Sequence, residues 1–393
     1  MGAARALGVE LTVASEVPST LEEARPAELL TLDFERPERA AERVREFAAR
    51  YPVHGVLGVD DDTVVVAAAV AEALGMQGNA MAAALAARDK YVQRERLAAA
   101  AVRVPRYELH AIDEDSRAAA ARVPYPCVLK PLRLAASRGV IRADDAATFA
   151  AAHARLRTIL AAPEAARCGE PARKFLVEEY VPGTEVAVEG LLVDGRLSVL
   201  AVLDKPDPLE GPFFEETIYV TPSRLPAGER GAAEDVVWQA ARALGLREGP
   251  IHAEVRLNER GAWLIELAAR PIGGRCSAVL RFGEGVSLEE IAIRHALGMP
   301  LGSLEREERA AGVMMIPVPG AGVLREVRGV ADARAVPLVE DVVITAHRGE
   351  RLVPWPEGSR YPGFIFARGE TPEAVERALR EAHGRLAFAV TPP

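Results

Sequence analysis

The chain has 393 residues and a formal net charge of −9 at pH 7, with 49% hydrophobic and 27% charged residues. These values are normal for a globular protein of two or three domains, and the acidic balance argues against nucleic-acid binding. The three cysteines lack metal-ligand spacing, no apolar run approaches the length of a membrane span, and the start lacks the regions of a signal peptide. We therefore expect a cytoplasmic protein without a disulfide framework.

Residues 1–88 alternate strand-like and helix-like segments, an order that predicts a parallel sheet in an N-terminal Rossmann-like domain. The chain opens on what reads as the end of a helix, so we expect this domain to lack its first strand and the native chain to start before Met1. The predicted strands are residues 10–15, 29–34 and 53–59, and the predicted helices are residues 37–51 and 63–75.

Residues 89–307 read as a mixed α+β domain with two hairpins. The first hairpin turns at residues 193–196 and the second around residues 258–261. The predicted strands are residues 125–130, 174–181, 184–193, 197–204, 251–257 and 262–267, and the predicted helices are residues 143–160 and 228–245.

Residues 308–393 read as a small C-terminal α+β domain. Strand-like segments at residues 313–318 and 338–345 are followed by a turn-rich stretch at residues 354–363 and by a final helix at residues 372–386.

Two of the four lysines stand at positions that favour phosphate binding. Lys90 follows Asp89 at the head of a helical segment, and Lys130 ends a short apolar run. In a chain so rich in Arg, a lysine is expected where a compact ammonium fits and a forked guanidinium does not, as at the phosphate oxygens of a nucleotide. The alternative is chance survival on a solvated surface.

The second hairpin carries two glutamates that we expect to face each other. A three-residue loop at 259–261 would place Glu254 opposite Glu266, with their Cβ atoms about 4.5–5.5 Å apart. Facing carboxylates need a cation, and Mg²⁺ is usually held by one or two carboxylates together with substrate phosphates. The alternative is an ion-pair network with Arg256 or Arg270.

Arg270 follows this hairpin and precedes the Gly273-Gly274 pair. An Arg fork beside such a turn can grip a carboxylate or a phosphate in a bidentate manner, while backbone N–H groups add to the grip. The alternative is an ordinary glycine turn with a surface arginine.

The chain resembles the ATP-grasp superfamily of ATP-dependent carboxylate–amine ligases over nearly its whole length. The resemblance implies that residues 89–307 form a two-lobed ATP-grasp fold, with a smaller lobe at about 105–181 and a larger lobe at about 182–307. The segments that carry the resemblance, in family order, are residues 88–105, 124–131, 137–140, 175–185, 252–257 and 264–274.

The resemblance also implies a role for each candidate residue. Lys90 and Lys130 would bind the ATP phosphates, and residues 135–139 would form the loop that covers them, although this loop lacks the usual glycine richness. Residues 178–181 would read adenine through their backbone. The implied nucleotide-binding residues are Lys90, Lys130, Ser137, Arg138, Gly139, Glu178, Glu179, Tyr180, Val181 and Glu185 (ribose), the metal ligands are Glu254 and Glu266, and the catalytic residue is Arg270.

Many members of the superfamily have Asn two residues after the second metal-binding Glu, where this chain has Ala268. A small residue there, together with residues 316–369, resembles the dipeptide-forming L-amino-acid ligase branch. The resemblance implies that ATP and Mg²⁺ (or Mn²⁺) join a small-molecule carboxylate, an amino acid, to an amine through an acyl phosphate.

Other interpretations remain open at this stage. They are a glycinamide-synthetase-like or biotin-carboxylase-like ligase, a non-catalytic ATP-binding module, and, with respect to assembly, a homodimer. We expect no nucleic-acid or membrane partner. Further candidates for lining the pocket, each of which could equally be a solvated or structural residue, are His252, Arg275, Glu215, Glu216 and Lys205.

Overall fold

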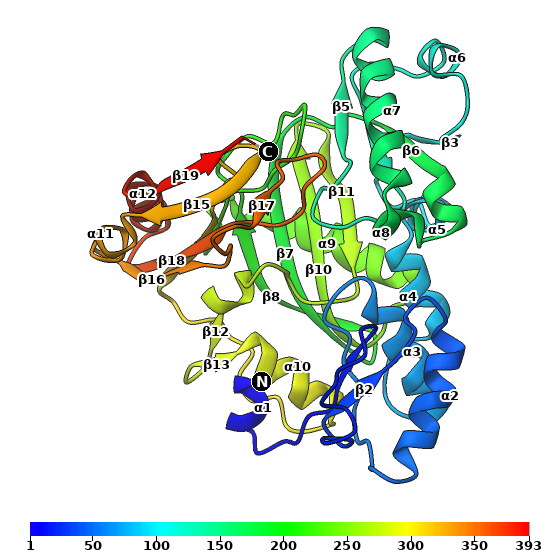
Figure 1. The fold of residues 1–393 in the computed structure, drawn as a ribbon, viewed down its shortest axis with the longest axis vertical. Coiled ribbons are helices and arrows are strands. Elements are labelled where there is room, and N and C mark those ends of the chain that lie inside the picture. The colour runs from blue at the N-terminus through cyan, green and yellow to red at the C-terminus, as the bar shows by residue number, and fades with distance from the viewer. Residues whose placement is uncertain (393) are drawn as a thin grey trace.

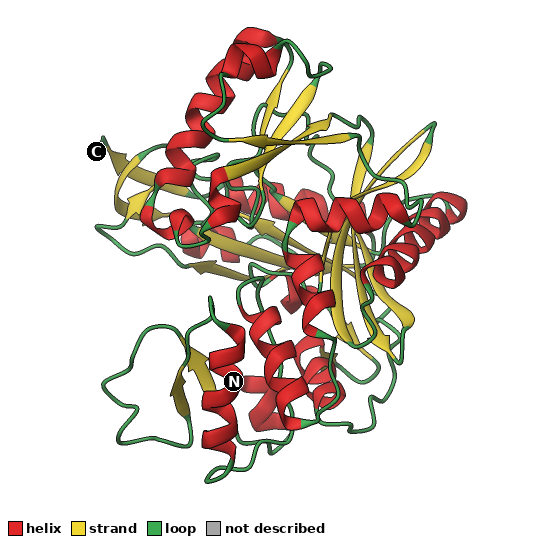
Figure 2. Cartoon of the chain, turned by 90° about the vertical axis from the view of Figure 1, so that its right-hand side faces the viewer, coloured by secondary structure: helices red, strands yellow, loops and turns green. Residues whose placement is uncertain are grey.

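The N-terminal region packs helices beside a two-stranded parallel sheet in the computed structural model, which describes residues 1–392 (Figure 2). Strands β1 (Val13–Ser15) and β2 (Leu29–Thr31) pair in parallel, as predicted. The prediction of a strand at 53–59 is wrong. No strand forms at these residues, and the backbone at Gly55 packs closely against Ala296, since a Cβ there would lie 2.5 Å from the Ala296 carbonyl oxygen.

The helices of this region follow from local signals. Helix α2 (Pro37–Ala48) starts on a proline and buries an apolar face that includes Val44 and Phe47, and α3 (Thr63–Leu74) stops at Gly75, whose φ is +65°. The remaining helices are α1 (Gly2–Ala6), which packs against α10 (Leu288–Ala296), and α4 (Met81–Arg88) (Figure 1).

The next part is a small lobe with an antiparallel four-stranded sheet in the order β3-β6-β4-β5. Helix α7 packs Phe149 and Leu156 on this sheet, and a capping box between Asp145 and Thr148 fixes its start. The elements of the lobe are β3 (Tyr107–Ala111), α6 (Ser116–Ala120), β4 (Cys127–Pro131), β5 (Ile141–Ala143), α7 (Ala146–Ala161), α8 (Pro163–Ala166), η1 (Glu170–Arg173) and β6 (Lys174–Glu179). Helix α5 (Lys90–Ala99) leads into it.

An eight-stranded sheet in the order β11-β10-β7-β8-β9-β14-β18-β16 forms the centre of the molecule (Figure 1). Helix α9 (Ala227–Leu244) packs Val237 and Leu244 into a core with β7 and β10, while η2 (Cys276–Val279) and α10 belong to a second core with the other strands. The strands are β7 (Thr184–Val193), β8 (Arg196–Asp204), β9 (Ile218–Thr221), β10 (Gly249–Asn258), β11 (Gly261–Ala268), β14 (Ala310–Met315), β16 (Val339–Ile344) and β18 (Gly363–Gly369).

The C-terminal segment contributes to this sheet and also forms a second one. Strand β14 pairs with β9 on one side and with β18 on the other, so the sheet runs through position 308, where a domain boundary was predicted. The domain limits themselves stay a prediction. The remaining elements are β12 (Arg281–Phe282), β13 (Val286–Ser287), β15 (Gly322–Arg328), α11 (Val330–Arg334), β17 (Arg351–Leu352), α12 (Pro372–Gly384) and β19 (Ala387–Thr391), of which β15, β17 and β19 form the three-stranded sheet.

These parts confirm the predicted fold class, an α/β region followed by α+β parts. Through residue 392, every helix is too short or too polar to span a bilayer.

Candidate active site

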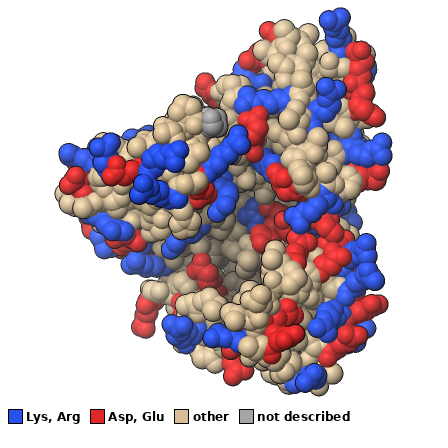
Figure 3. Space-filling model, in the orientation of Figure 1, with Lys and Arg blue, Asp and Glu red and all other residues tan. Residues whose placement is uncertain are grey.

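A cavity of about 320 Å³ lies where the N-terminal region, the small lobe and the large sheet meet. The face of the molecule shown in Figure 3 is hollowed between these parts. Asp61 reaches the cavity from the N-terminal region, Lys130 from the small lobe, Glu254 from the large sheet, and Tyr361 from the C-terminal segment. Residues spread over three hundred positions of the chain thus face one space.

Lys130 and Glu178 line one end of the cavity and form a buried triad with Arg94, which lies outside the cavity lining. Because β4 and β6 pair Val128 with Glu178, Lys130 lies on the same sheet face as Glu178, and Lys130 Nζ is 2.8 Å from Glu178 Oε2. Arg94 Nε donates to Glu178 Oε1 over 2.7 Å. Although burial favours the neutral acid, the two cations outweigh it and lower the pKa of Glu178 to about 2.

Lys90 joins three parts of the cavity wall. Asp89 caps α5 by accepting from two backbone N–H groups, which places Lys90 at the first helical position. Lys90 Nζ lies 2.9 Å from Glu266 Oε1 and donates to the Leu134 carbonyl over 3.0 Å. Burial disfavours the charged ammonium, but the carboxylates of Glu266 and Asp61 raise the pKa of Lys90. Both lysines singled out in the sequence therefore line the cavity.

The glutamate hairpin forms as predicted, but by a different route. The loop has two residues, since Asn258 pairs with Gly261, so the prediction of a three-residue loop is wrong. A β-bulge between Glu254 and Val255 shifts the register by one residue and brings Glu254 opposite Glu266 after all. Both glutamates line the cavity.

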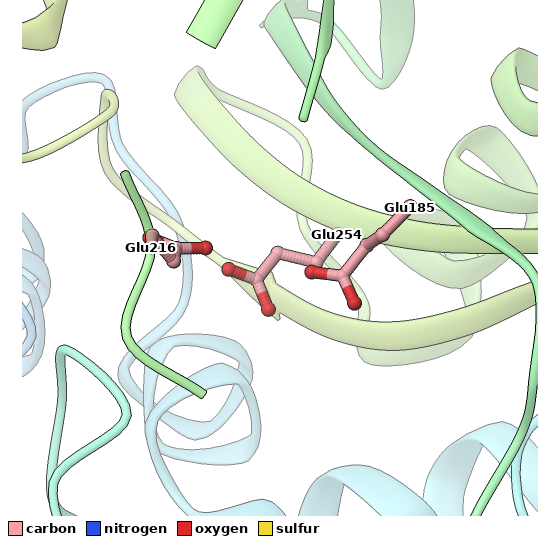
Figure 4. Close-up of side chains that lie close together, drawn as sticks. All are labelled: Glu185, Glu216 and Glu254. Atoms are coloured by element: carbon pink, nitrogen blue, oxygen red, sulfur yellow. The ribbon is translucent and has the colours of Figure 1, made fainter. Parts of the chain in front are cut away.

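Three carboxylates surround Lys205 beside this hairpin, and we call Glu185, Glu216 and Glu254 the acidic cluster (Figure 4). One oxygen from each lies within 4.8 Å of the others. Lys205 Nζ is 2.7 Å from Glu185 Oε1 and 3.1 Å from Glu254 Oε1, and it also contacts Glu216. The pKa of Glu216 rises to about 6, because burial and the neighbouring Glu254 carboxylate outweigh the attraction of Lys205.

Neither predicted arginine partner neutralises the glutamate pair. Arg256 Nε donates to Glu185 over 2.6 Å, and Arg270 Nη2 donates to Asp61 Oδ2 over 2.9 Å. Asp61 raises the pKa of Arg270 further, despite burial. In this structure Lys205 and Lys90 are the cations that contact Glu254 and Glu266 directly, and Arg256 joins the network around Glu254 only through Glu185 and Lys205.

The loop between β4 and β5 covers the triad end of the cavity, but only part of it points inward. Ser137 lines the cavity. Arg138 was expected to face the nucleotide, yet its Nη2 donates to Glu164 over 2.6 Å, and the backbone N–H of Gly139 donates to the Pro356 carbonyl over 2.9 Å. Ala136 and Ser137 have φ values of 53° and 54°, a left-handed conformation that costs about 1–3 kcal/mol for each such residue.

The segment at 178–181 also forms cavity wall. Glu179, Tyr180 and Val181 line it beside Glu178, and Tyr180 packs on two guanidinium groups, that of Arg142 lying 4.1 Å from the ring centroid. Tyr180 also donates its backbone N–H to Pro126.

The further pocket candidates divide into two groups. Glu216 and His252 line the cavity, and Lys205 is buried next to Glu254. Glu215 instead accepts from the Val318 backbone N–H over 3.0 Å, and Arg275 lies exposed on a turn, so these two expectations are wrong. His252 contacts the buried Glu189, which raises the pKa of His252 against the effect of burial..

Asp61, Arg94 and Glu189 were missed by the sequence analysis. A signal existed for Lys205, because it is one of only four lysines and directly follows strand β8. Asp61 gave no such signal, since it is one of three consecutive aspartates and meets Arg270 only in the folded chain.

The donor set fits a hard divalent cation. Carboxylate oxygens are the ligands that Mg²⁺ prefers, and Glu254 and Glu266 each have an ammonium group in this structure, from Lys205 and Lys90. The acidic cluster holds three carboxylates against two cations, Lys205 and Arg256.

The cavity lies between a small antiparallel lobe and a large sheet and is lined by Lys90, Lys130, Glu254 and Glu266, an arrangement that points to the ATP-grasp class. Three family models match the chain in that order: the ATP-grasp N-terminal domain at residues 1–78, the ATP-grasp domain at residues 123–279, and the L-amino acid ligase C-terminal domain 2 at residues 314–391. These matches, together with the structural likeness to an L-amino acid ligase, support the L-amino-acid ligase branch of the ATP-grasp superfamily.

Individual proteins agree with this assignment. Alanine–anticapsin ligase from Bacillus subtilis is 29% identical over 294 residues, which are 70% of this chain and 62% of that protein, so this chain spans less than two thirds of its length. The crystal structure of an L-amino acid ligase from Bacillus licheniformis superposes with a TM-score of 0.82 at 26% identity, covering 99% of this chain and 95% of that one. A carboxyaminoimidazole ribonucleotide synthase from Aspergillus clavatus, complexed with ATP, shares the fold at 17% identity, with a TM-score of 0.70 over 98% of this chain and 94% of that one.

Proposed function

We propose that this protein is an ATP- and Mg²⁺-dependent ligase that joins an amino-acid carboxylate to an amine through an acyl phosphate and releases ADP and phosphate. The observation that supports this most is the convergence of Lys90, Lys130, Glu254, Glu266 and Arg270 on one cavity. The match to the L-amino acid ligase C-terminal domain and the likeness to an L-amino acid ligase structure support an amino acid as the carboxylate.

The triad end of the cavity suits the nucleotide. Glu178 already neutralises one of the two cations beside it, so Arg94 and Lys130 leave one net positive charge for phosphate oxygens. The segment 178–181 offers backbone groups to adenine, and Glu185 lies near enough to the cavity to accept from ribose hydroxyls. Ser137 and the backbone of the loop beside it cover the phosphates.

The glutamate hairpin suits the metal ion. A bound Mg²⁺ would supply positive charge that neutralises the negative charge developing on the phosphate oxygens. Glu254 and Glu266 would hold it, and their facing positions on β10 and β11 fix their spacing before any ligand arrives. Lys90, which contacts Glu266, would keep that carboxylate correctly oriented.

Arg270 lies between the metal hairpin and the N-terminal region, where its guanidinium can orient the reacting carboxylate. An oxygen of that carboxylate would attack the γ-phosphorus and ADP would leave; an amine would then attack the acyl carbon and phosphate would leave, with the amine's proton passing to solvent or to a cavity carboxylate. The protein acts by positioning and by electrostatic stabilisation. The covering loop keeps water from hydrolysing the acyl phosphate.

A phosphate-release screen tests this proposal. The protein is incubated with ATP and Mg²⁺, and with amino acids singly and in pairs, and products are identified by mass spectrometry. We expect phosphate release that depends on a pair of amino acids, in equal amount to a dipeptide. ATP binding without any acceptor-dependent release would favour the non-catalytic module, and release that requires bicarbonate would favour a carboxylase.

Residence in the cytoplasm and assembly as a homodimer stay predictions of the sequence. The three cysteines are free, as a reducing compartment requires.

A further inference from the structure

The turn between β17 and β18 fastens the loop that covers the triad end of the cavity (Figure 1). Trp355 Nε1 donates to the Ala136 carbonyl over 2.8 Å, and the backbone N–H of Gly139 donates to the Pro356 carbonyl over 2.9 Å. Next to them, Arg155 Nη2 of the small lobe donates to Glu357 Oε2 over 2.7 Å. Three consecutive residues of the C-terminal segment thus hold the small lobe.

The fastened loop has a conformation that its own sequence does not favour. Ala136 and Ser137 both lie in the left-handed region, where residues with a Cβ are uncommon, and neither is the glycine that would accept it freely. A flexible loop of this sequence would spend little time in that state. Contacts from outside the loop must therefore stabilise this conformation. The hydrogen bond from the Trp355 side chain and the hydrogen bond to the Pro356 carbonyl are placed to do so.

The indole of Trp355 is itself firmly held. It is 4% exposed, and its ring lies 4.7 Å from that of Tyr361, measured between centroids. Tyr361 lines the cavity together with Ser359, from the same turn. One short C-terminal segment therefore contacts the covering loop at one side and forms cavity wall at the other.

We propose that Trp355 is a positioning residue, which holds the loop 135–139 closed over the nucleotide end of the cavity, and that Tyr361 links its position to whatever occupies the cavity beside it. The role in catalysis rests on the proposed function, whereas the fastening of the loop does not. In this proposal, Trp355 acts on the reaction through the covering loop.

Hydrogen–deuterium exchange on the protein without ligands tests the fastening directly. Trp355→Phe keeps an aromatic ring on Tyr361 but removes the N–H donor. We expect exchange at the amides of 136–140 to become faster by roughly fivefold or more, as expected for the loss of one hydrogen bond. Trp238→Phe is the matched control, because Trp238 is exposed on α9 and far from the loop in the fold, and it should leave these amides unchanged.

Kinetics then test the consequence. In Trp355→Phe, the KM for ATP should rise severalfold, and the share of ATP hydrolysed without dipeptide should increase, while the KM for amino acids changes less. A purely structural tryptophan would lower stability without this split. Glu357→Gln, at a half-exposed position, should change the KM for ATP and the uncoupled hydrolysis in the same direction but by less, and it should not disturb the core.

If the amides of 136–140 exchange at the wild-type rate in Trp355→Phe and in Glu357→Gln, as they should in Trp238→Phe, the proposal is overturned. If the protein turns over no substrate pair but exchange at these amides still rises in Trp355→Phe alone, the proposed function fails and the fastening stands. If exchange rises while the KM for ATP and the coupling to dipeptide formation stay at wild-type values, the positioning role is rejected.

Discussion

The two charged groups of the cavity use the same kinds of side chain in opposite proportions. In the buried triad, two cations, Arg94 and Lys130, flank the single carboxylate of Glu178. In the acidic cluster, Lys205 and Arg256 face three carboxylates. One group therefore carries an excess positive charge and the other an excess negative charge, although both are largely buried.

The two ends of the cavity therefore differ in the charge of the ligand that each would bind. A buried charge without a partner is costly, so each group is expected to bind the ion that completes it. Under the proposed function, the triad end would take the phosphates of ATP, and Glu254 of the acidic cluster would hold the metal ion together with Glu266.

Removing a carboxylate at the negative end should have the largest effect on activity. Glu254→Gln keeps the size and removes the charge that would hold the metal, so we expect turnover to fall on the order of a thousandfold or more. The variant should stay folded, because the substitution also removes the repulsion between Glu254 and its neighbouring carboxylates. Steady-state kinetics and thermal unfolding on the same variant check this, and a variant with near wild-type turnover would show that the hairpin is structural.

Changing the charge balance of the triad should affect stability. The folded pKa of Glu178, about 2, lies below its ordinary value of 4.5, so its contribution is fully present above pH 4.5 and is lost as the pH falls toward 2. Glu178→Gln should lower the free energy of unfolding by about 3 kcal/mol at pH 7, and the difference from wild type should vanish near pH 2.

Urea unfolding at several pH values measures this difference. Glu284→Gln is the control, because Glu284 is exposed and its substitution should not change the pH dependence. A constant gap between Glu178→Gln and wild type from pH 7 to pH 2 would contradict the assigned pKa.

Arg270 lines the same cavity, and its substitution tests how the positive and negative ends of the cavity differ. Arg270→Lys keeps the charge but loses the fork that Asp61 and the Pro271 carbonyl hold in place. We expect turnover to fall on the order of a hundredfold while ATP affinity changes little, since geometry matters most as the acyl phosphate forms. An equal loss in both quantities would instead make Arg270 a nucleotide ligand.

The smallest effect should follow from Lys130→Arg. The charge at the positive end is retained, but a guanidinium is larger and flatter than the ammonium that fits against Glu178. We expect ATP binding to weaken by roughly tenfold, and Lys130→Ala to weaken it more. Calorimetry with ATP measures both, and Lys174→Arg, at an exposed position on β6, should bind ATP like the wild type.

The sequence analysis recovered what local patterns encode. Helices α2, α3 and α9 were predicted because their starts, stops and periodicity lie within the helix itself. Glu254 and Glu266 were found because a hairpin brings near neighbours together, although the expected loop was one residue too long and the bulge that corrects the register carries no obvious signal. Bulges depend on packing across the sheet, which a single strand does not reveal.

The missed residues are those whose partners are far along the chain. Arg94 and Glu178 are 84 positions apart, and Asp61 and Arg270 are 209 apart. Before folding, each reads as an ordinary charged residue on a solvated face. Resemblance to a family recovered part of this information, because it carries the outcome of folding for the matched motifs, but it gave no role to Lys205 or Asp61.

The continuous eight-stranded sheet has a consequence for how the protein is made. Strand β18 lies between β14 and β16 and pairs with both. Strand β16 is synthesised before β18, but it can join the sheet only after residues 363–369 have left the ribosome. Until then, β14 presents an open edge to other nascent chains. A chimera that exchanges the C-terminal segment near residue 308 would need a new β14 that pairs with the four residues of strand β9. The new segment would also have to supply side chains that fit the cavity wall.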